Sequence, residues 1–141
     1  MDWVTSIHQA IQYIEEHLRE ELNIREIAQQ AALSPFYFQK GFAMLCDLTV
    51  GDYIRQRRLS AAGLEVLTTD RKIIDIALEF GYDSPDSFTK AFTRFHGLTP
   101  TALQKEEYSK SQNVGNVSLS PRAKIHNWLK SAQSPKGVVL F

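Results

Sequence analysis

Three side chains within residues 34–46 could make specific contacts with the polar edge of another molecule. Gln39 presents a hydrogen-bond donor and an acceptor together, Lys40 presents a cation, and Phe36 presents an apolar ring. An amide matches an adenine edge, a cation matches guanine or a phosphate, and a ring packs on a thymine methyl group. In a helix, Phe36 and Lys40 share one face and Gln39 lies on its flank. The set indicates base recognition. The alternative is that Lys40 is a solvated charge and Phe36 a boundary aromatic.

A second set of this kind lies 50 residues later in the chain. The same helical rotation exposes Asp86, Lys90 and Thr93. The residues on their flanks are Ser87, Thr89 and Arg94. The carboxylate of Asp86 would repel a phosphate, so we expect the first set to bind DNA more sequence-specifically than the second.

The first set requires a helix that is held by its neighbours, and residues 23–42 predict one. Asn23 followed by Glu26 is a capping-box pattern that starts a helix. A turn follows at residues 32–34, and Ser34-Pro35 starts the next helix with an N-cap and a proline at the first helical position. Two short helices joined by a tight turn predict a helix-turn-helix over residues 24–45. Many α-hairpins share this outline, so it is weak evidence alone.

The outline occurs twice, which strengthens it. Ile27-Ala28 recurs as Ile76-Ala77 at an offset of 49, and Ser34-Pro35 recurs as Ser84-Pro85 at an offset of 50. The change of offset falls in the turn, where one extra residue is easiest to absorb. We therefore predict a second helix-turn-helix over residues 73–96.

The remaining segments also carry helical periodicity. We expect a first helix from about Thr5 to Glu21, a long helix over residues 50–67 and a short helix over 99–108. In the long helix, Ile54, Ala61 and Leu64 are predicted to form the inner face, with Ala62 and Leu67 beside it. Residues 1–108 carry no strand pattern, so the predicted fold class is all-α.

Contacts with the DNA backbone would come from helix ends and from cationic or hydroxyl side chains. Helix N-termini at Ser34 and Ser84 offer free N–H groups to phosphates. The densest positive charge in the first 108 residues is Arg55, Arg57 and Arg58, and a solvated face with an internal glutamate pair is an equally weighted alternative. The predicted backbone contacts are Ser34, Tyr37, Arg55, Arg57, Arg58, Ser84, Thr89 and Arg94.

Composition limits the classes of protein that the chain can belong to. Residues 1–108 hold 11 Lys and Arg against 16 Asp and Glu, a net charge of −5, which counts against DNA binding unless the acids lie away from the reading faces. One cysteine, no secretory pattern and no long apolar run suit a reducing cytoplasm without membrane association. No phosphate loop, zinc-ligand spacing or nucleophile–histidine pairing is present, so we expect no enzyme activity, metal or cofactor.

The segment IIDIALEFGYDSPDSFTKAFTRFHGLTP at residues 73–100 resembles the signature of the AraC/XylS family of bacterial transcription regulators. The resemblance covers residues 5–108. It implies a seven-helix domain in which the helix at 50–67 joins two helix-turn-helices whose reading helices enter successive major grooves. Family members read bases from positions that match Phe36, Gln39, Lys40, Asp86, Ser87 and Lys90. Val50 departs from the family's usual proline.

The resemblance implies a sequence-specific, nucleoid-associated regulator that binds double-stranded promoter DNA, and by analogy an activator that contacts RNA polymerase. The alternative is a helical protein-interaction module that has lost specific DNA binding. Residues 109–141 read as a polar, basic tail with a possible short helix at 121–132. These 33 residues are too few for an effector-sensing domain, so we expect a stand-alone regulator or a fragment of a longer one.

Overall fold

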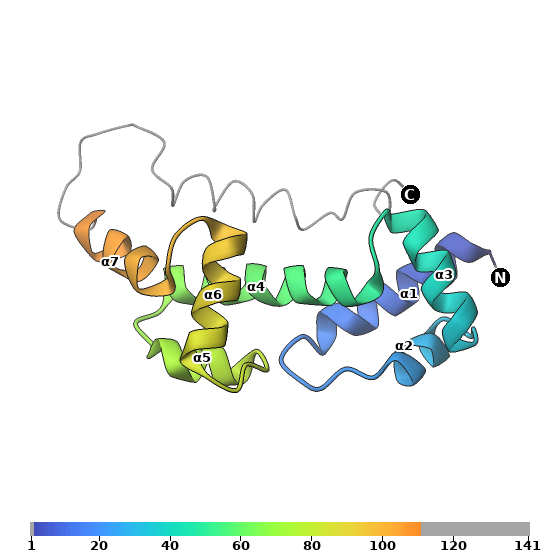
Figure 1. Ribbon diagram of the computed structural model, residues 1–141. Helices are drawn as coiled ribbons and strands as arrows, with labels where there is room; N and C mark the ends of the chain where they lie inside the picture. The colour runs from blue at the N-terminus through green and yellow to red at the C-terminus, as the bar shows by residue number, and fades with distance from the viewer. Residues whose placement is uncertain (1, 111–141) are drawn as a thin grey trace. The chain divides into compact units, whose positions relative to one another are not determined.

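The computed structural model describes residues 2–110, which form seven α-helices and no strand (Figure 1). The helices are α1 (Trp3–Glu16), α2 (Ile24–Gln30), α3 (Pro35–Cys46), α4 (Val50–Thr68), α5 (Ile73–Glu79), α6 (Pro85–His96) and α7 (Pro100–Lys110). The all-α prediction with seven helices is confirmed. The predicted helix at 121–132 and most of the predicted tail lie outside the described residues.

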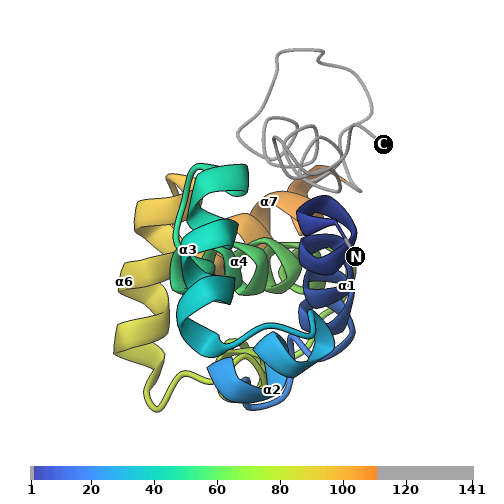
Figure 2. The same ribbon diagram turned by 90° about the vertical axis from the view of Figure 1, so that its right-hand side faces the viewer.

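The chain divides into two compact units, and the boundary falls within α4 between Arg57 and Arg58. In the first unit, α2 and α3 follow one another through a short turn and α1 lies beside them (Figure 2). Its largest fully buried side chains are Ile7, Ile14, Ile27, Phe38 and Phe42. This core holds α3 by one face and leaves the other face to solvent.

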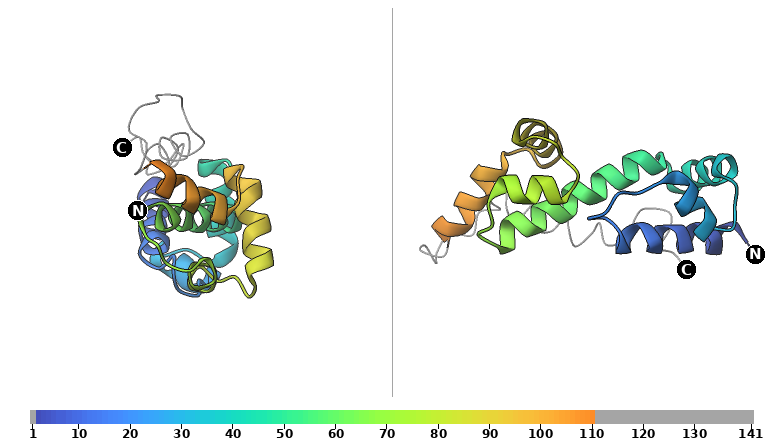
Figure 3. Two further views of the ribbon diagram at one scale, coloured as in Figure 1. Left: turned by 90° about the vertical axis from the view of Figure 1, so that its left-hand side faces the viewer. Right: turned by 90° about the horizontal axis from the view of Figure 1, so that it is seen from below.

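The second unit repeats this arrangement with α5 and α6. The second half of α4 and the helices α5, α6 and α7 share one core (Figure 3). Ile76, Phe88 and Phe92 are fully buried there, at the positions that Ile27, Phe38 and Phe42 take in the first unit. Equivalent residues therefore hold the second helix of each motif.

The turns of the two motifs end α2 and α5 in the same way. The N–H of Leu33 donates to the carbonyl of Ala28 at 3.0 Å, and the N–H of Tyr82 donates to that of Ala77 at 3.0 Å. The residues before them, Ala32 and Gly81, have left-handed backbones, which defines a Schellman motif in both turns. One more residue separates this motif from the next N-cap in the second unit. This extra residue explains why the offset between the two repeats changes from 49 to 50.

The first helix is shorter than its periodicity predicts and ends at Glu16 instead of Glu21. The N–H of His17 donates to the carbonyl of Ile14 at 3.0 Å, and the His17 ring Nδ1–H donates to the carbonyl of Tyr13 at 2.7 Å. These two bonds satisfy carbonyls that a continuing helix would have paired. Leu18 is still buried, so its apolar character extends the periodic pattern past the helix end.

The inner face predicted for α4 is wrong at Leu64, whose side chain is 46% exposed. The residues of this helix buried in the second core are Leu59, Ala62, Val66 and Leu67. Small and apolar residues occur on more than one side of α4, so periodicity did not define its buried face. Packing against α5 and α6 selects it.

Candidate nucleic-acid interface

The first motif presents one face of α3 because its opposite face is anchored in the core. Ser34 is the N-cap and its Oγ accepts from the N–H of Tyr37 at 3.3 Å, while Pro35 occupies the first turn. Phe38 and Phe42 are fully buried, with ring centroids 5.8 Å apart. The cap fixes where the helix begins and the two rings fix its rotation.

The exposed face of α3 is aromatic at its N-terminal end. Phe36 is 67% exposed and Tyr37 57% exposed, and the two rings meet edge to face at 5.6 Å between centroids. The Lys40 ammonium lies 5.9 Å from the centroid of the Phe36 ring, a cation–π contact. Gln39 is also exposed. The structure thus gathers Phe36, Tyr37, Gln39 and Lys40 on one accessible surface.

The second motif presents α6 in the same manner. Ser84 is the N-cap, and its Oγ accepts from the Ser87 N–H at 3.2 Å. The Ser87 hydroxyl donates to the Ser84 carbonyl at 3.0 Å and also meets the Ser84 hydroxyl at 3.0 Å. The Ser87 hydroxyl therefore already donates its proton to a group of the same motif. The exposed side chains of this face are Asp86, Ser87, Lys90 and Arg94.

Thr89 and Thr93 are less accessible than the helical rotation predicts. Both are half-buried, and the buried Thr93 Oγ1 has no hydrogen-bond partner among the described residues. The equivalent residue in α3, Ala43, is half-buried as well. Ala43 and Thr93 are therefore less accessible than the residues in the first turns of their helices.

The three arginines of α4 have three different environments. Arg57 donates through Nε to Glu15 Oε1 at 2.7 Å and through Nη2 to Oε2 at 3.3 Å, and its side chain is 18% exposed. Arg55 forms an exposed ion pair with Asp52. Arg58 is half-buried, and desolvation lowers the pKa of its guanidinium. The contact of Arg57 supports the internal-pair alternative for this residue.

The Glu15 carboxylate also binds Tyr53, which connects α1 to the core beneath α3. The Tyr53 hydroxyl donates to Glu15 Oε1 at 2.7 Å, and burial together with this carboxylate raises the pKa of the phenol. The Tyr53 ring packs edge to face on Phe42 at 5.5 Å between centroids. Sequence reasoning allowed an internal glutamate pair for Arg57 but did not identify Glu15 or Tyr53, because these partners lie 38 and 42 residues apart in the chain.

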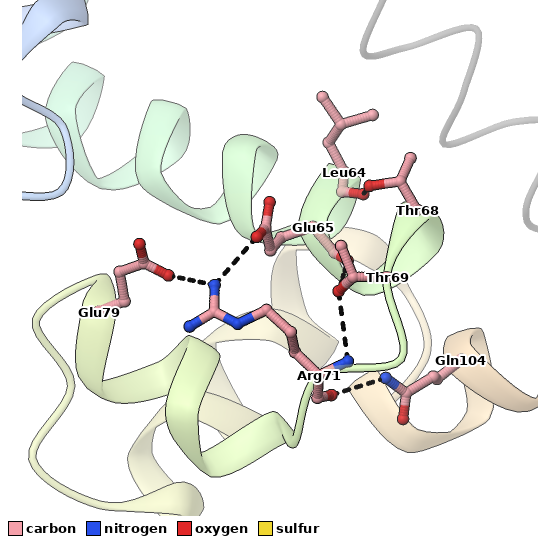
Figure 4. Close-up of polar contacts among 7 residues, drawn as sticks. All are labelled: Leu64, Glu65, Thr68, Thr69, Arg71, Glu79 and Gln104. Carbon is pink, nitrogen blue, oxygen red and sulfur yellow. Dashed lines mark hydrogen bonds and ion pairs between the residues drawn. The ribbon is translucent and has the colours of Figure 1, made fainter.

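A second network holds the ends of α4 and α5 together (Figure 4). Arg71 Nη1 donates to Glu79 Oε2 at 2.6 Å and to Glu65 Oε1 at 2.9 Å, and these bonds raise the pKa of the guanidinium. The Gln104 side chain of α7 donates to the Arg71 carbonyl at 2.9 Å. Arg71 lies between α4 and α5, and its side chain and carbonyl connect α4, α5 and α7 of the second unit.

His96 fixes the C-terminal end of α6. Its Nε2–H donates to the Leu59 carbonyl at 2.8 Å, and its ring packs on Phe92 at 4.3 Å between centroids. A Cβ at Gly63 would lie 2.8 Å from two atoms of this ring, so glycine permits the approach. Burial lowers the pKa of His96. No sequence signal identified this contact.

Other kinds of site find no support between residues 2 and 110. In that part of the chain, no three His, Cys, Asp or Glu side chains cluster closely enough to hold a metal ion. None of the helices described there has the length and apolar character needed to span a bilayer. Cys46 is a free, buried thiol.

Two helix-turn-helices, each with a capped and exposed second helix, define a helix-turn-helix protein of the two-motif class. The model of a family described as "Helix-turn-helix domain" matches residues 27–106. The chain is 42% identical over 95 residues to the regulatory protein SoxS of Escherichia coli K12, covering 67% of this chain and 89% of SoxS. It is 35% identical over 95 residues to the transcriptional activator AarP of Providencia stuartii, covering 67% of this chain and 70% of AarP.

A solved structure shows the same fold. The chain superposes on a regulator from Chromobacterium violaceum with an AraC-type DNA-binding domain at a TM-score of 0.69 and 20% identity, covering 73% of this chain and 92% of that one. The chain belongs to the AraC-type helix-turn-helix family of DNA-binding transcription regulators. The predicted family and the predicted function of sequence-specific regulator are confirmed.

Proposed function

We propose that the chain binds promoter DNA by placing α3 and α6 in successive major grooves and so activates transcription. The observation that carries the proposal is the equivalence of the two helices. Each begins at a serine N-cap, each is anchored by two buried phenylalanines, and each leaves its first turns exposed. An exposed helix of this kind is what a helix-turn-helix inserts into a groove.

Base contacts are assigned to the exposed residues of the first turns. On α3, Gln39 suits adenine, Lys40 suits guanine and Phe36 suits a thymine methyl. On α6, Lys90 suits guanine and the Asp86 carboxylate can accept from the cytosine amino group. Ser87 takes part through its remaining acceptor capacity, since its donor is bonded to Ser84.

Backbone contacts are assigned to groups that remain accessible. These are the exposed residues Ser34, Tyr37, Arg55 and Arg94, to which the half-buried hydroxyl residues Ser84 and Thr89 are added. Arg55 is 57% exposed and can exchange its weak surface pair with Asp52 for a phosphate. For Arg57 we favour a positioning role through Glu15, and for half-buried Arg58 a secondary one.

The regulatory outcome and the partners follow from the family. AarP is named a transcriptional activator, and we extend that role to this chain. An activator on promoter DNA acts in the bacterial cytoplasm and is expected to contact RNA polymerase. The domain bounds that we assign to this activity are residues 5–108, with the motifs at 24–45 and 73–96 joined by the helix at 50–67.

Selection of DNA fragments from a random pool tests the proposal. We expect a motif of two half-sites, and Gln39→Ala is expected to relax preference at one or two base pairs of one half-site. Gln9→Ala, an exposed glutamine on α1, is the matched control and should leave the motif unchanged. An unchanged motif with Gln39→Ala would refute the assignment of α3.

The net negative charge of residues 1–108 favours the other candidate function, a helical module that binds proteins. Retention of random-sequence DNA in a gel shift at low salt separates the two functions. Absence of retention at micromolar protein would support the interaction module and contradict DNA binding.

A further inference from the structure

The outward faces of α2 and α5 differ, although the two helices hold the same place in their motifs. On α2 the exposed residues include Arg25 and Gln29, and at the offset of 49 the same positions of α5 are Ile74 and Leu78. Ile74 is 45% exposed and Leu78 57% exposed. The fold accepts a polar pair at these positions in the first unit, so packing within the motif does not require the apolar pair in the second.

Ile74 and Leu78 form one continuous apolar surface, which we call the α5 patch. They are four residues apart, so their side chains are neighbours on one face of the helix. Leu64 is also exposed, but in Figure 4 its side chain points away from α5. An apolar face that its own unit leaves uncovered is a candidate docking surface.

The charges around the α5 patch are mostly negative. Residues 65–83 contain five Asp and Glu against two Lys and Arg, a net charge of −3. One of the two cations, Arg71, already bonds both Glu65 and Glu79. Asp75 is exposed on α5 itself, at the rim of the patch. A partner that suits this face therefore combines apolar side chains with cations.

A segment with this combination follows α7 in the same chain. Residues 121–132 contain three Lys and Arg and no acid, a net charge of +3. Ser120-Pro121 repeats the serine cap and first-turn proline that start α3 and α6. Three apolar residues follow at i, i+3 and i+4, a spacing that places them on one face of a helix: Ile125, Trp128 and Leu129. The sequence predicts a basic amphipathic helix here.

We propose that residues 121–132 dock on the α5 patch of the same chain. The apolar face of the segment would cover Ile74 and Leu78, and its cations would lie beside Asp75 and the neighbouring carboxylates. Docking of this kind involves neither reading helix, so it is independent of the proposed function. It assigns to the second unit an internal binding surface for a basic amphipathic segment.

The segment can reach the patch from the end of α7. Gln104 of α7 donates to the Arg71 carbonyl at 2.9 Å, and Arg71 lies just before the first residue of α5. From Gln104 to Lys110, the last residue of α7, the helix rises by about 9 Å. Residues 111–120 span up to about 33 Å when extended. This length permits docking within one chain.

A second copy of the chain fits the patch less well than the segment does. A stable interface buries about 800 Å² on each partner, and two half-exposed side chains offer a small part of that area. The same face of a second copy would also bring like charges together. A tethered segment binds at an effective concentration on the order of millimolar, so a small contact is sufficient.

The fluorescence of Trp128 measures docking in the full chain. The chain has two tryptophans, and Trp3→Phe leaves Trp128 as the only indole. Because the docked indole is shielded from water, we expect its emission at a shorter wavelength than that of free indole. We also expect weak quenching by acrylamide, an uncharged quencher that the cations of the segment do not attract or repel.

The variant that removes the α5 patch copies α2. Ile74→Arg combined with Leu78→Gln gives α5 the residues that α2 has at the same positions, so the fold should be retained. We expect the ratio of docked to free segment to fall by about tenfold. The Trp128 emission should shift to longer wavelength and its quenching should increase. Leu64→Gln is the matched control, since it also replaces an exposed leucine, and should change neither. Circular dichroism checks that the variants are folded.

A charge reversal tests the electrostatic part of the proposal. Asp75→Lys places a cation at the rim of the patch and should shift the Trp128 emission in the same direction as the double variant. Glu21→Lys makes the same change of net charge at an exposed residue of the first unit and should have no effect.

Three results would overturn docking within one chain. Trp128 could emit and be quenched like free indole, which would mean that the segment does not dock. Shielding of Trp128 that survives the double variant on α5 would place the segment elsewhere. Shielding that is lost on dilution, together with a dimer in sedimentation velocity, would assign the patch to a second copy. None of these results depends on whether the chain binds DNA.

Discussion

Ala32 and Gly81 occupy the same position in the two motifs, and both have left-handed backbones, with φ of 56° and 88°. Each is the residue at which its Schellman turn reverses the chain between the helices of its motif. Glycine adopts this conformation without a penalty from Cβ, whereas alanine is strained there. The first motif therefore carries a cost that the second does not.

Ala32→Gly should relieve that strain. We expect the free energy of unfolding to rise by about 0.5–1 kcal/mol, because the gain in the turn exceeds the added entropy of the unfolded chain. Urea denaturation measures it. The reverse change, Gly81→Ala, should lower stability by about 1 kcal/mol.

Gly51→Ala is the matched control for both changes. Gly51 is helical, and nothing lies within 4 Å of a Cβ built on it, so alanine there should be neutral or stabilising. If Gly81→Ala and Gly51→Ala had the same effect, the left-handed conformation would not be the cause.

Arg55 and Arg57 should separate stability from DNA affinity. Arg57→Ala removes the cationic hydrogen-bond donor of the half-buried Glu15 carboxylate. Because that carboxylate then lacks its cationic partner, we expect the free energy of unfolding to fall by about 1–3 kcal/mol. Arg55→Ala should leave stability nearly unchanged and reduce the slope of log affinity against log salt by about 1. Urea denaturation and titrations at several salt concentrations measure the two effects.

The opposite result for Arg57→Ala would assign this residue to DNA binding instead of to stability. A reduced salt slope with unchanged stability for Arg57→Ala would mean that the arginine leaves Glu15 for a phosphate when DNA binds. Arg57→Lys serves as a control for charge, since it keeps the cation but loses the two-point contact with the carboxylate.

His96 should make the second unit less stable in mild acid. Burial lowers its pKa in the folded protein below that in the unfolded chain, so the unfolded chain binds the proton more readily. Its contribution is complete above about pH 6.5 and is lost as the pH falls through the folded-state pKa. Thermal unfolding at pH 7.5 and 5.5 measures this.

His96→Gln can retain a donor to the Leu59 carbonyl and should remove that part of the pH dependence. His8→Gln, on the exposed surface of α1, is the control and should retain it. Equal pH dependence in wild type and His96→Gln would place its origin elsewhere.

Cys46 should be unreactive while the protein is folded. Burial raises the pKa of its thiol to about 11, so at pH 8 little thiolate forms and reagents have poor access to it. We expect its reaction with a chromogenic disulfide to follow the urea unfolding curve. Rapid reaction of one thiol per protein chain in the absence of urea would contradict the burial of Cys46.

The sequence predicted the parts of this fold that local chemistry determines. Ser34 and Ser84 are recognisable N-caps, and the spacing of Phe88 and Phe92 identifies a buried face. The end of α1 was missed because it depends on the bonds of His17 to its own helix. Glu15 as the glutamate partner of Arg57, and the bond from His96 to Leu59, were not identified because they join distant segments, which periodicity does not pair.

The buried phenylalanines and serine caps that hold α3 and α6 are the same, while the residues that face outward differ. The exposed face of each helix can therefore change without altering the residues that support it. Placing the exposed residues of α6 at the equivalent positions of α3 would give a protein whose two motifs present the same face and whose buried cores are unchanged. In a duplicated motif of this kind, the exposed residues of one motif can change while those of the other stay the same. The buried residues that hold each helix are not affected by such a change.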